Sequence, residues 1–389
     1  MKRILIAVVI LSTFFGMPNH LAYATNRTAD IKDQEQSYFP LPICLPGMPN
    51  DGTCLFYGPA QAVSEIREAG FPYPPRELPA THPSTELGKI PVSLAKINYP
   101  ADQPAPIYGT FEDAVAGVNP ISQIAPGTLR YISFTYWQNH NGNAYLLLST
   151  GGWMRASPAV YTDFQGLEFY DNPDNDFGWI VNETPAFKEP SFWAEKTDAV
   201  LKREEIIQVY NQLEAEGVIW YQIAPDKWVE STKAKIVTFN PMPPEGVDSD
   251  RWIEINLFQQ TMAVYEDGKI LYASLVTTGV PPLYTRPGVF KIYEKKPLET
   301  MQGATAEDLS DFYYLQDVPW TMYFDEARAL HAAYWRTYFG YPASHGCVNL
   351  SPTDAQWLYE WAEEGDFVWA HDPSGETPTD PDFYGPGAP

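Results

Sequence analysis

Proline is spread through the whole chain and limits what it can fold into. The sequence has 37 prolines among its 389 residues, and aromatic residues make up 15%. Proline lacks the backbone N–H that a helix interior needs, so frequent prolines leave little room for long helices. Aromatic residues favour strands. Hydrophobic residues make up 44% and charged residues 19%, as in ordinary folded proteins. We therefore expect a mainly β protein built of short strands and turns.

The length and the charge narrow the class of protein further. A chain of 389 residues has room for two or three domains. The formal net charge is -24, which repels the phosphate backbone of nucleic acids, so we expect no nucleic-acid partner. A well-solvated surface is the simplest explanation for so many carboxylates.

The first 24 residues have the pattern of an export signal. Residues 1–3 form a charged start, residues 4–11 are apolar, and residues 22–24 form a small-residue cleavage site. We predict a signal peptide over residues 1–24 and an exported protein of the periplasm, the cell wall or the extracellular space, with no stable membrane insertion after cleavage. An uncleaved anchor is the alternative, although the apolar run is short for a membrane span.

The three cysteines are an odd number for an exported protein. This count predicts one disulfide and one free thiol. Cys44 and Cys54 flank a turn-rich loop, so we predict that they pair, which stabilises the fold by about 2–3 kcal/mol. Cys347 then stays free. The alternative is that Cys44 and Cys54 remain reduced.

Composition divides the chain after the leader into five segments. Residues 25–85 are rich in proline, glycine and polar residues and are predicted to be a tether. Residues 86–160 and 161–240 each offer a short strand, a long loop and a strand–turn–strand that ends near a tryptophan, which resembles small SH3-like β-barrels. A proline-rich linker precedes a third domain at 250–371. Residues 372–389 are predicted to be a disordered tail.

Alternating strands and one short helix are predicted for the third domain. Residues 254–272 alternate around a turn, as in an antiparallel meander. Ser351 is the predicted N-cap of a helix over 352–361, and residues 367–370 are predicted to be the last strand. In the second module, residues 202–210 are predicted to be a helical insertion.

A thiol and two imidazoles come close together in the sequence of the third domain. His331 precedes the block Ser344-His345-Gly346-Cys347-Val348-Asn349-Leu350. A cysteine attacks a carbonyl as the thiolate, which requires a base, and the resulting oxyanion requires hydrogen-bond donors. Cys347 can be the nucleophile, His331 or His345 the base, and the backbone around Gly346 the donor. These residue types predict acyl transfer.

A zinc site is an alternative interpretation of the same residues. His331, His345, Cys347 and His371 could surround a metal ion, but they lack the tight spacing of common zinc sites, and no nearby carboxylate is placed to activate water. A buried structural cysteine is another alternative. We expect no metal and no cofactor.

The ordered motifs of the third domain resemble the L,D-transpeptidase (YkuD-like) catalytic domain. The resemblance rests on residues 252–256, Gln260, Tyr265, residues 277–279, 286–290 and 330–331, Trp335, residues 339–340, Pro342 and residues 344–349. It covers 250–371 and implies a β-rich domain with a short helix. It also implies a cysteine enzyme of cell-wall biogenesis and cell shape, which cross-links peptidoglycan stem peptides through a thioester and is acylated by carbapenems.

The resemblance also implies roles for single residues. Cys347 would be the nucleophile and His331 the proton acceptor and donor, while His345 and Gly346 would shape the oxyanion loop. An exchange of roles between His331 and His345 stays open, because spacing does not show which ring faces the thiol. Five further residues are expected to position or contact the substrate: Ser344, Asn349, Tyr323, Trp335 and Arg336.

The sequence departs from the family pattern in two places. Ala332 follows His331 where glycine or serine is frequent, although its carbonyl can still orient the ring. Residues 325–328 replace an expected glycine-rich turn. Residues 296–314 are expected to form a flap over the cleft.

Two other functions remain open at this point. In an L,D-carboxypeptidase, water would replace the acceptor amine on the same acyl-enzyme. In a non-catalytic wall-binding protein, the two SH3-like modules would carry the function. Labelling of Cys347 by a carbapenem would separate the enzymes from the binding protein.

Overall fold

The computed structural model describes residues 76–385, except 305 and 307–310, together with residues 63, 66, 67, 70 and 71. The chain divides into two units, Met1–Ser64 and Glu65–Pro389, and the strands belong to the second. The predicted signal peptide and the predicted Cys44–Cys54 disulfide lie outside the described residues. Within the described part, no helix is both long and apolar enough to span a membrane.

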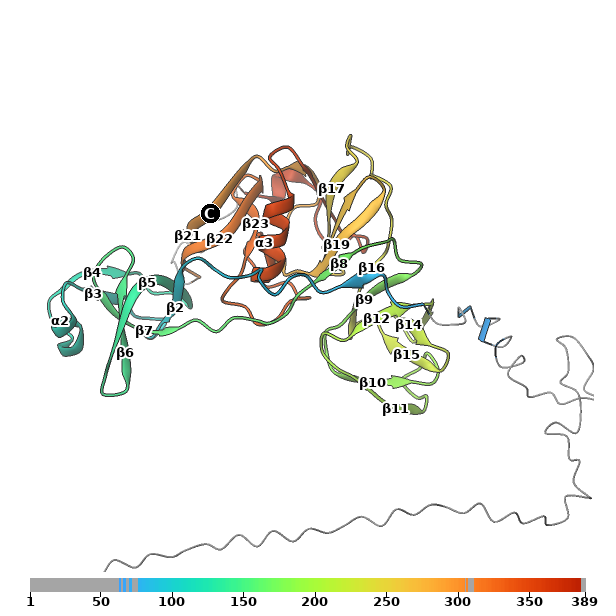
Figure 1. The fold of residues 1–389 in the computed structure, drawn as a ribbon, viewed down its shortest axis with the longest axis horizontal. Helices are drawn as coiled ribbons and strands as arrows, with labels where there is room; N and C mark the ends of the chain where they lie inside the picture. The colour runs from blue at the N-terminus through green and yellow to red at the C-terminus, as the bar shows by residue number, and fades with distance from the viewer. Residues whose placement is uncertain are drawn as a thin grey trace, which may run out of the picture. The chain divides into compact units, whose positions relative to one another are not determined.

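Strands dominate the structure, so the mainly β prediction is confirmed (Figure 1). The C-terminal domain contains β17 (Arg251–Asn256), β18 (Thr261–Glu266), β19 (Lys269–Leu275), β20 (Gly288–Lys291), β21 (Glu294–Gly303), β22 (Tyr313–Asp325), β23 (Arg328–Ala332), β24 (Val348–Leu350), α3 (Pro352–Trp361) and β25 (Phe367–His371). The predicted antiparallel meander is present as β17, β18 and β19. β25 adds to it in parallel with β17, and β20 follows at the edge.

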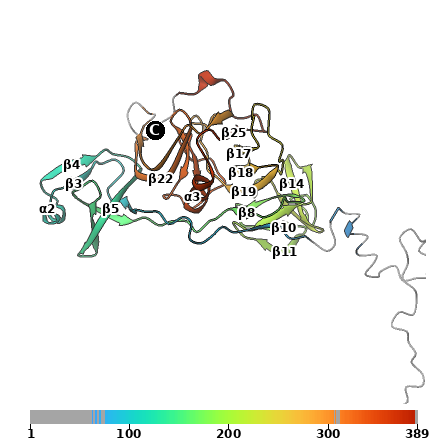
Figure 2. The ribbon, with the colours of Figure 1, turned by 45° about the horizontal axis from the view of Figure 1, so that its top comes forward.

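The core of the C-terminal domain lies between this sheet and the strands β22, β23 and β24. Ile253 and Ile255 of β17 alternate toward this core and meet Met322 of β22 and Leu358 of α3. All four side chains are fully buried. Burial of each such side chain contributes about 1.5–3 kcal/mol. Helix α3 contacts β22 and β23 (Figure 2), so the two strands that lead to the site are supported from behind.

Helix α3 begins where the sequence predicts it. The hydroxyl of Ser351 accepts a hydrogen bond from the N–H of Asp354 at 3.2 Å, which caps the helix. The carboxylate of Asp354 is fully buried and accepts from the N–H of Gly166 at 2.8 Å, the hydroxyl of Tyr272 at 2.7 Å and the hydroxyl of Ser274 at 2.5 Å. This carboxylate therefore joins the helix to the meander and to the segment that precedes it.

Replacing Asp354 with alanine should destabilise the fold. Asp354→Ala leaves the buried N–H of Gly166 and two hydroxyls without their acceptor, so we expect the free energy of unfolding to fall by about 3 kcal/mol or more. The matched control is Asp174→Ala, because Asp174 forms an exposed ion pair with Arg76 and should change stability by less than about 1 kcal/mol. Urea unfolding curves of both variants test this, and equal midpoints would contradict it.

The two segments predicted as modules also consist mostly of strands. The first contains β2 (Ser93–Ile97), β3 (Ala105–Tyr108), α2 (Phe111–Ala116), β4 (Pro120–Ile124), β5 (Leu129–His140), β6 (Asn143–Leu148) and β7 (Trp153–Pro158). The second contains β9 (Asp176–Ile180), β10 (Thr184–Phe187), β11 (Lys196–Leu201), β12 (Ile206–Val209), β13 (Asn211–Ala215), β14 (Val218–Ala224), β15 (Lys227–Glu230) and β16 (Ala234–Val237). Their SH3-like character stays a prediction. Two further strands, β1 (Ala80–Thr81) and β8 (Leu167–Phe169), extend the meander sheet next to β19.

Two local predictions are wrong. Residues 202–210 do not form a helix, because β12 pairs with β9 and Ile207 is buried in the module core. The tail is ordered as far as residue 385: it forms a short 3-10 helix, η1 (Pro381–Phe383), and the carbonyl of Gly385 accepts from Arg328 Nη2 at 2.9 Å. Composition predicted disorder there because it does not register such contacts with the rest of the chain.

Candidate active site

Cys347 lies directly before β24 and is partly exposed. Its thiol donates to the carbonyl oxygen of Ala327 at 3.8 Å. Burial raises the pKa of the Cys347 thiol, and a backbone hydrogen bond from Ala329 and the charge of Arg328 oppose this shift. The thiol is therefore protonated near neutral pH and requires a base before it can act as a nucleophile.

His331 reaches the same place from β23. The parallel pairing of β23 and β24 sets it opposite Asn349. Its Nδ1 lies 3.1 Å from the carbonyl oxygen of Ala332, and its Nε2 lies 3.1 Å from Asn349 Nδ2. A carbonyl can only accept, so Nδ1 carries the proton and Nε2 is the basic nitrogen. The carbonyl of Ala332 thus contacts the ring in the way proposed from the sequence.

The charge state of His331 suits a base. Its ring is 2% exposed. Burial lowers the pKa of His331 to about 4, against the opposing effect of the hydrogen bond to Ala332. The imidazole is therefore neutral at pH 7 and can accept a proton.

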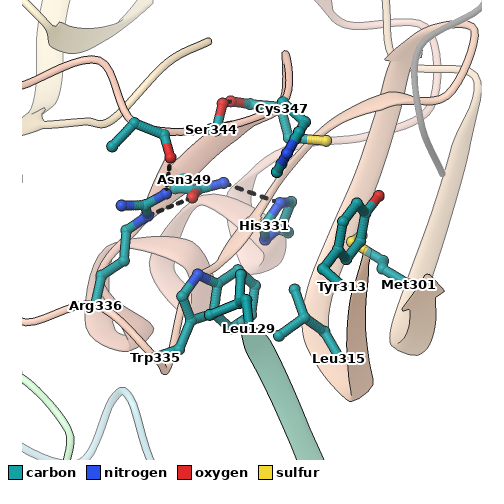
Figure 3. A pocket seen from close by; sticks show the side chains of 12 residues that line it. Leu129, Met301, Tyr313, Leu315, His331, Trp335, Arg336, Ser344, Cys347 and Asn349 are labelled. Carbon is teal, nitrogen blue, oxygen red and sulfur yellow. Dashed lines mark hydrogen bonds between the residues drawn. The ribbon is translucent and has the colours of Figure 1, made fainter. Parts of the chain in front are cut away.

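Arg336 fixes the orientation of Asn349. Arg336 Nε donates to Asn349 Oδ1 at 2.7 Å, and its guanidinium also donates to the carbonyl of Ala343. The amide NH₂ of Asn349 is thereby turned toward His331 (Figure 3). Burial lowers the pKa of Arg336 to about 10, so it stays charged at neutral pH. Ala332, Asn349 and Arg336 together hold the imidazole in one orientation.

Ser344 closes the loop that carries the thiol. Its hydroxyl donates to the carbonyl of Cys347 at 2.6 Å and accepts from the N–H of Gly346 at 3.2 Å. The N–H of Gly346 is thus engaged by Ser344, and the role of the surrounding backbone as oxyanion donor stays a prediction. Gly346 has φ +116, and a Cβ there would lie 3.2 Å from Arg328 Nε. Its contribution is the shape of the loop, since L side chains rarely adopt this conformation.

Three threonines form hydrogen bonds with the loop of residues 344–349. The sequence assigns none of them a role. Thr277 exchanges backbone hydrogen bonds with Asn349 at 2.8 and 3.0 Å, and the carbonyl of Thr278 accepts from the N–H of Ser344. The hydroxyl of Thr285 donates to the carbonyl of Gly346 at 2.8 Å and accepts from the N–H of Gly279 at 3.0 Å. Residues 277–279 contributed to the family resemblance, but nothing in the sequence singled out Thr285.

A buried ion cluster lies beside the thiol, in the turn where the sequence departs from the family pattern. The carboxylate of Asp325 accepts from Arg286 Nε at 3.0 Å and from Arg328 Nη1 at 3.1 Å. The side chains of Asp325 and Arg328 are 1% and 6% exposed. Arg328 Nε has no hydrogen-bond partner within the described residues. The departure in sequence therefore places a cation next to the nucleophile.

The predicted site residues enclose a small cavity (Figure 3). Its volume is about 60 Å³, and it is lined by Leu129, Met301, Tyr313, Leu315, His331, Trp335, Arg336, Ala343, Ser344, His345, Cys347 and Asn349. The His345 ring stacks on Tyr313, with ring centres 5.2 Å apart. Burial lowers the pKa of His345 as well, so its ring is also neutral at pH 7 and can accept a proton.

Tyr323, Trp335 and Arg336 are among the residues expected to position or contact the substrate, and the last two line the cavity. The Trp335 ring lies 5.7 Å from that of His331, and its Nε1 has no hydrogen-bond partner in the described part of the chain. Arg336 also lines the cavity. Tyr323 does not line it: it stacks on Tyr293 at 6.1 Å, and Lys296 Nζ lies 5.4 Å from its ring centre. Burial and the nearby charges of Glu299 and Cys347 raise the pKa of Tyr323, so its phenol lies near the thiol although it is not part of the cavity lining.

Removing the amide of Asn349 should slow acylation of Cys347. In Asn349→Ala, His331 loses the N–H that faces Nε2 and Arg336 loses an acceptor. We expect kcat/KM to fall about tenfold. The acid limb of its pH profile should move upward, because an N–H donated to Nε2 favours the neutral ring. The exposed Asn98, bonded to Ser157, provides the control Asn98→Ala. An unchanged pH profile in Asn349→Ala would contradict the orienting role.

Comparison with known proteins points to one family. Residues 250–369 match the family model YkuD, the L,D-transpeptidase catalytic domain. No curated protein matches the chain. Among solved structures, an L,D-transpeptidase (Yku) from Stackebrandtia nassauensis is 28% identical over 36% of this chain and 62% of that chain, with a TM-score of 0.27. The chain thus spans less than two thirds of that protein.

Two further solved structures are similar to this chain. The catalytic domain of the E. faecium L,D-transpeptidase is 28% identical over 33% of this chain and 100% of that chain, with a TM-score of 0.29. The LD transpeptidase LdtMt1, solved in complex with imipenem, is 15% identical over 53% of this chain and 90% of that chain, with a TM-score of 0.29.

Proposed function

We propose that this chain is an exported cysteine transpeptidase that cross-links peptidoglycan stem peptides, since its residues 250–369 match the L,D-transpeptidase catalytic domain family YkuD. The observation that supports the cysteine chemistry is the presence of the Cys347 thiol and the neutral, oriented imidazole of His331 in the lining of one cavity. The peptidoglycan substrate follows from the family.

The first half of the reaction forms a thioester. Cys347 turns away from the carbonyl of Ala327, the N–H of Asn349 releases His331 Nε2, and the thiol proton passes to that nitrogen. The sulfur then attacks the carbonyl between the L-centre of a diamino acid and the terminal D-residue of the donor stem. The C–N bond breaks, the leaving amine takes the proton from His331, and the D-residue departs. No cofactor is required, because the thioester keeps the acyl group activated.

The second half transfers the acyl group. The side-chain amine of a second stem attacks the thioester carbonyl and gives its proton to His331. The C–S bond breaks, and the thiolate recovers a proton from the imidazole. The carbonyl of Ala332 holds the ring through Nδ1 in both halves, and Arg336 continues to hold Asn349.

Product analysis with defined stems tests the proposal. Purified protein is incubated with disaccharide stem peptides that offer both a donor and a free acceptor amine, and the products are separated by mass. We expect a cross-linked dimer and release of the terminal D-residue. Shortened monomers without dimer would indicate the carboxypeptidase. Unchanged stems, together with no carbapenem adduct on Cys347, would favour the binding protein.

A further inference from the structure

The flap strand of the C-terminal domain pairs with the first module. β5 runs parallel to β22, with Tyr313 opposite Leu129 and Leu315 opposite Tyr131. A buried hydrogen bond from the N–H of Ser133 to Gln316 Oε1, 3.2 Å long, lies beside this pairing. β22 therefore pairs with β21 of its own domain and with β5 of the first module. The flap sheet thus includes a strand that lies far upstream in the sequence.

Alternation along the flap strand separates two environments. Tyr313 and Leu315 line the cavity that holds Cys347. Phe312 and Tyr314, on the other face, pack against the core of the first module around Ile132. Successive side chains of a strand point to opposite faces, so the flap lies between the module and the site. The module therefore supports the flap along residues 312–315.

Leu129 extends the first module into the cavity wall. It lines the cavity from β5 and lies next to Met301 and Leu315 of the flap. Arg336, Ser344 and Asn349 provide polar groups to the same cavity. An apolar surface opposite polar groups fits a ligand that is aliphatic on one side and amide-bearing on the other.

We propose that the first module completes the substrate site: Leu129 contacts the aliphatic part of the acyl donor, and the β5–β22 pairing holds the flap that covers Cys347. The substrate part of this proposal rests on the transpeptidase function proposed above. Leu129 is a specificity-determining residue in it, because it touches the donor without taking part in proton transfer. The methylene groups of a diamino-acid side chain are the donor groups that suit an apolar wall.

Because the cavity is small, the pairing of β5 with β22 should affect how substrate reaches Cys347. A cavity of about 60 Å³ is well below the roughly 150 Å³ that admits a benzene molecule, so with β22 in this position it accommodates only a small part of a stem peptide. Movement of β22 breaks or strains its pairing with β5. The module therefore opposes opening, and weakening the contact should expose the thiol.

At Gly127 the first module lies in close contact with the flap, at the backbone of Phe312. A Cβ on Gly127 would lie 2.2 Å from the carbonyl oxygen of Phe312, so any side chain there pushes the start of β5 away from the flap. Gly109 lies in the same module, and a Cβ there meets only Ile121, at 3.5 Å. Gly127→Ala and Gly109→Ala are thus a matched pair of substitutions.

The first test measures donor specificity. We expect Leu129→Ala to raise the KM for the donor stem about tenfold while kcat changes less than about twofold. Leu129→Met, which keeps the apolar volume, should restore KM. Ile121→Ala, at an exposed position of the same module, is the control. A KM for Leu129→Ala equal to that of the wild type would overturn the contact with the donor.

The second test measures access to Cys347 and needs no substrate. We expect iodoacetamide to alkylate Cys347 several-fold faster in Gly127→Ala than in the wild type or Gly109→Ala, with melting curves recorded on the same samples to establish that each variant is folded. Equal alkylation rates in folded Gly127→Ala and Gly109→Ala would overturn the hold on the flap. If the wild type turns over no stem peptide, the transpeptidase function fails and the donor contact fails with it, but the alkylation rates still decide the flap claim.

Discussion

A Cys347→Ala variant is expected to form no cross-linked dimer. The substitution removes the only atom of the cavity lining that can form a thioester, while His331, Asn349 and Arg336 remain in place. Removal of a nucleophile in enzymes of this kind lowers the rate by about 10⁴-fold or more. The measurement is the initial rate of dimer formation from disaccharide stems, separated by mass.

The fold of this variant should be intact, because only one sulfur is lost and its hydrogen bond to Ala327 is long, at 3.8 Å. A melting temperature close to that of the wild type is the control that attributes the loss to chemistry. Dimer formation at the wild-type rate in Cys347→Ala would remove Cys347 from the mechanism.

The second large effect is expected for His331→Gln. Glutamine cannot take the thiol proton, and burial raises the pKa of Cys347, so little thiolate forms near neutral pH. We expect acylation by the donor stem or a carbapenem to slow about 10²- to 10⁴-fold at pH 7. Raising the pH should recover part of the rate, because hydroxide then removes the proton. Stopped-flow acylation between pH 5 and pH 10 measures this, with His345→Gln as the matched variant.

The pH dependence of stability gives a second readout for His331. Its pKa in the folded protein is about 4, below the value of about 6.5 in an unfolded chain. Between these values the unfolded state binds more protons, so the wild type loses stability as the pH falls from about 6.5 to about 4. His331→Gln should lack this loss of stability.

The acylation rates also decide between the two histidines. If His345→Gln abolishes acylation and His331→Gln does not, the roles of the two histidines are exchanged.

The chemistry of the site could be predicted from the sequence because it is carried by neighbouring residues. The block around Cys347 contains thiol, imidazole and glycine in order, and Ser351 marks the start of α3 through a local cap. The contact between His331 and Asn349 depends instead on parallel pairing of β23 with β24, and spacing does not encode that register.

The contribution of the first module to the cavity could not be predicted from the sequence. Leu129 lies in a different predicted module from Cys347, and only the pairing of β5 with β22 brings it to the cavity. Nothing in its local sequence differs from an ordinary strand residue. The same holds for Thr285, whose hydrogen bond to Gly346 depends on two loops that meet in the folded chain.

The most direct measurement is the intact mass of the protein during turnover of a donor stem without an acceptor. We expect the mass of the protein to increase by the mass of the stem minus its terminal D-residue. The added acyl group should lie on the peptide that contains Cys347, and hydroxylamine should remove it, as a thioester requires. An adduct on another residue, or dimer production without any covalent enzyme species, would contradict it.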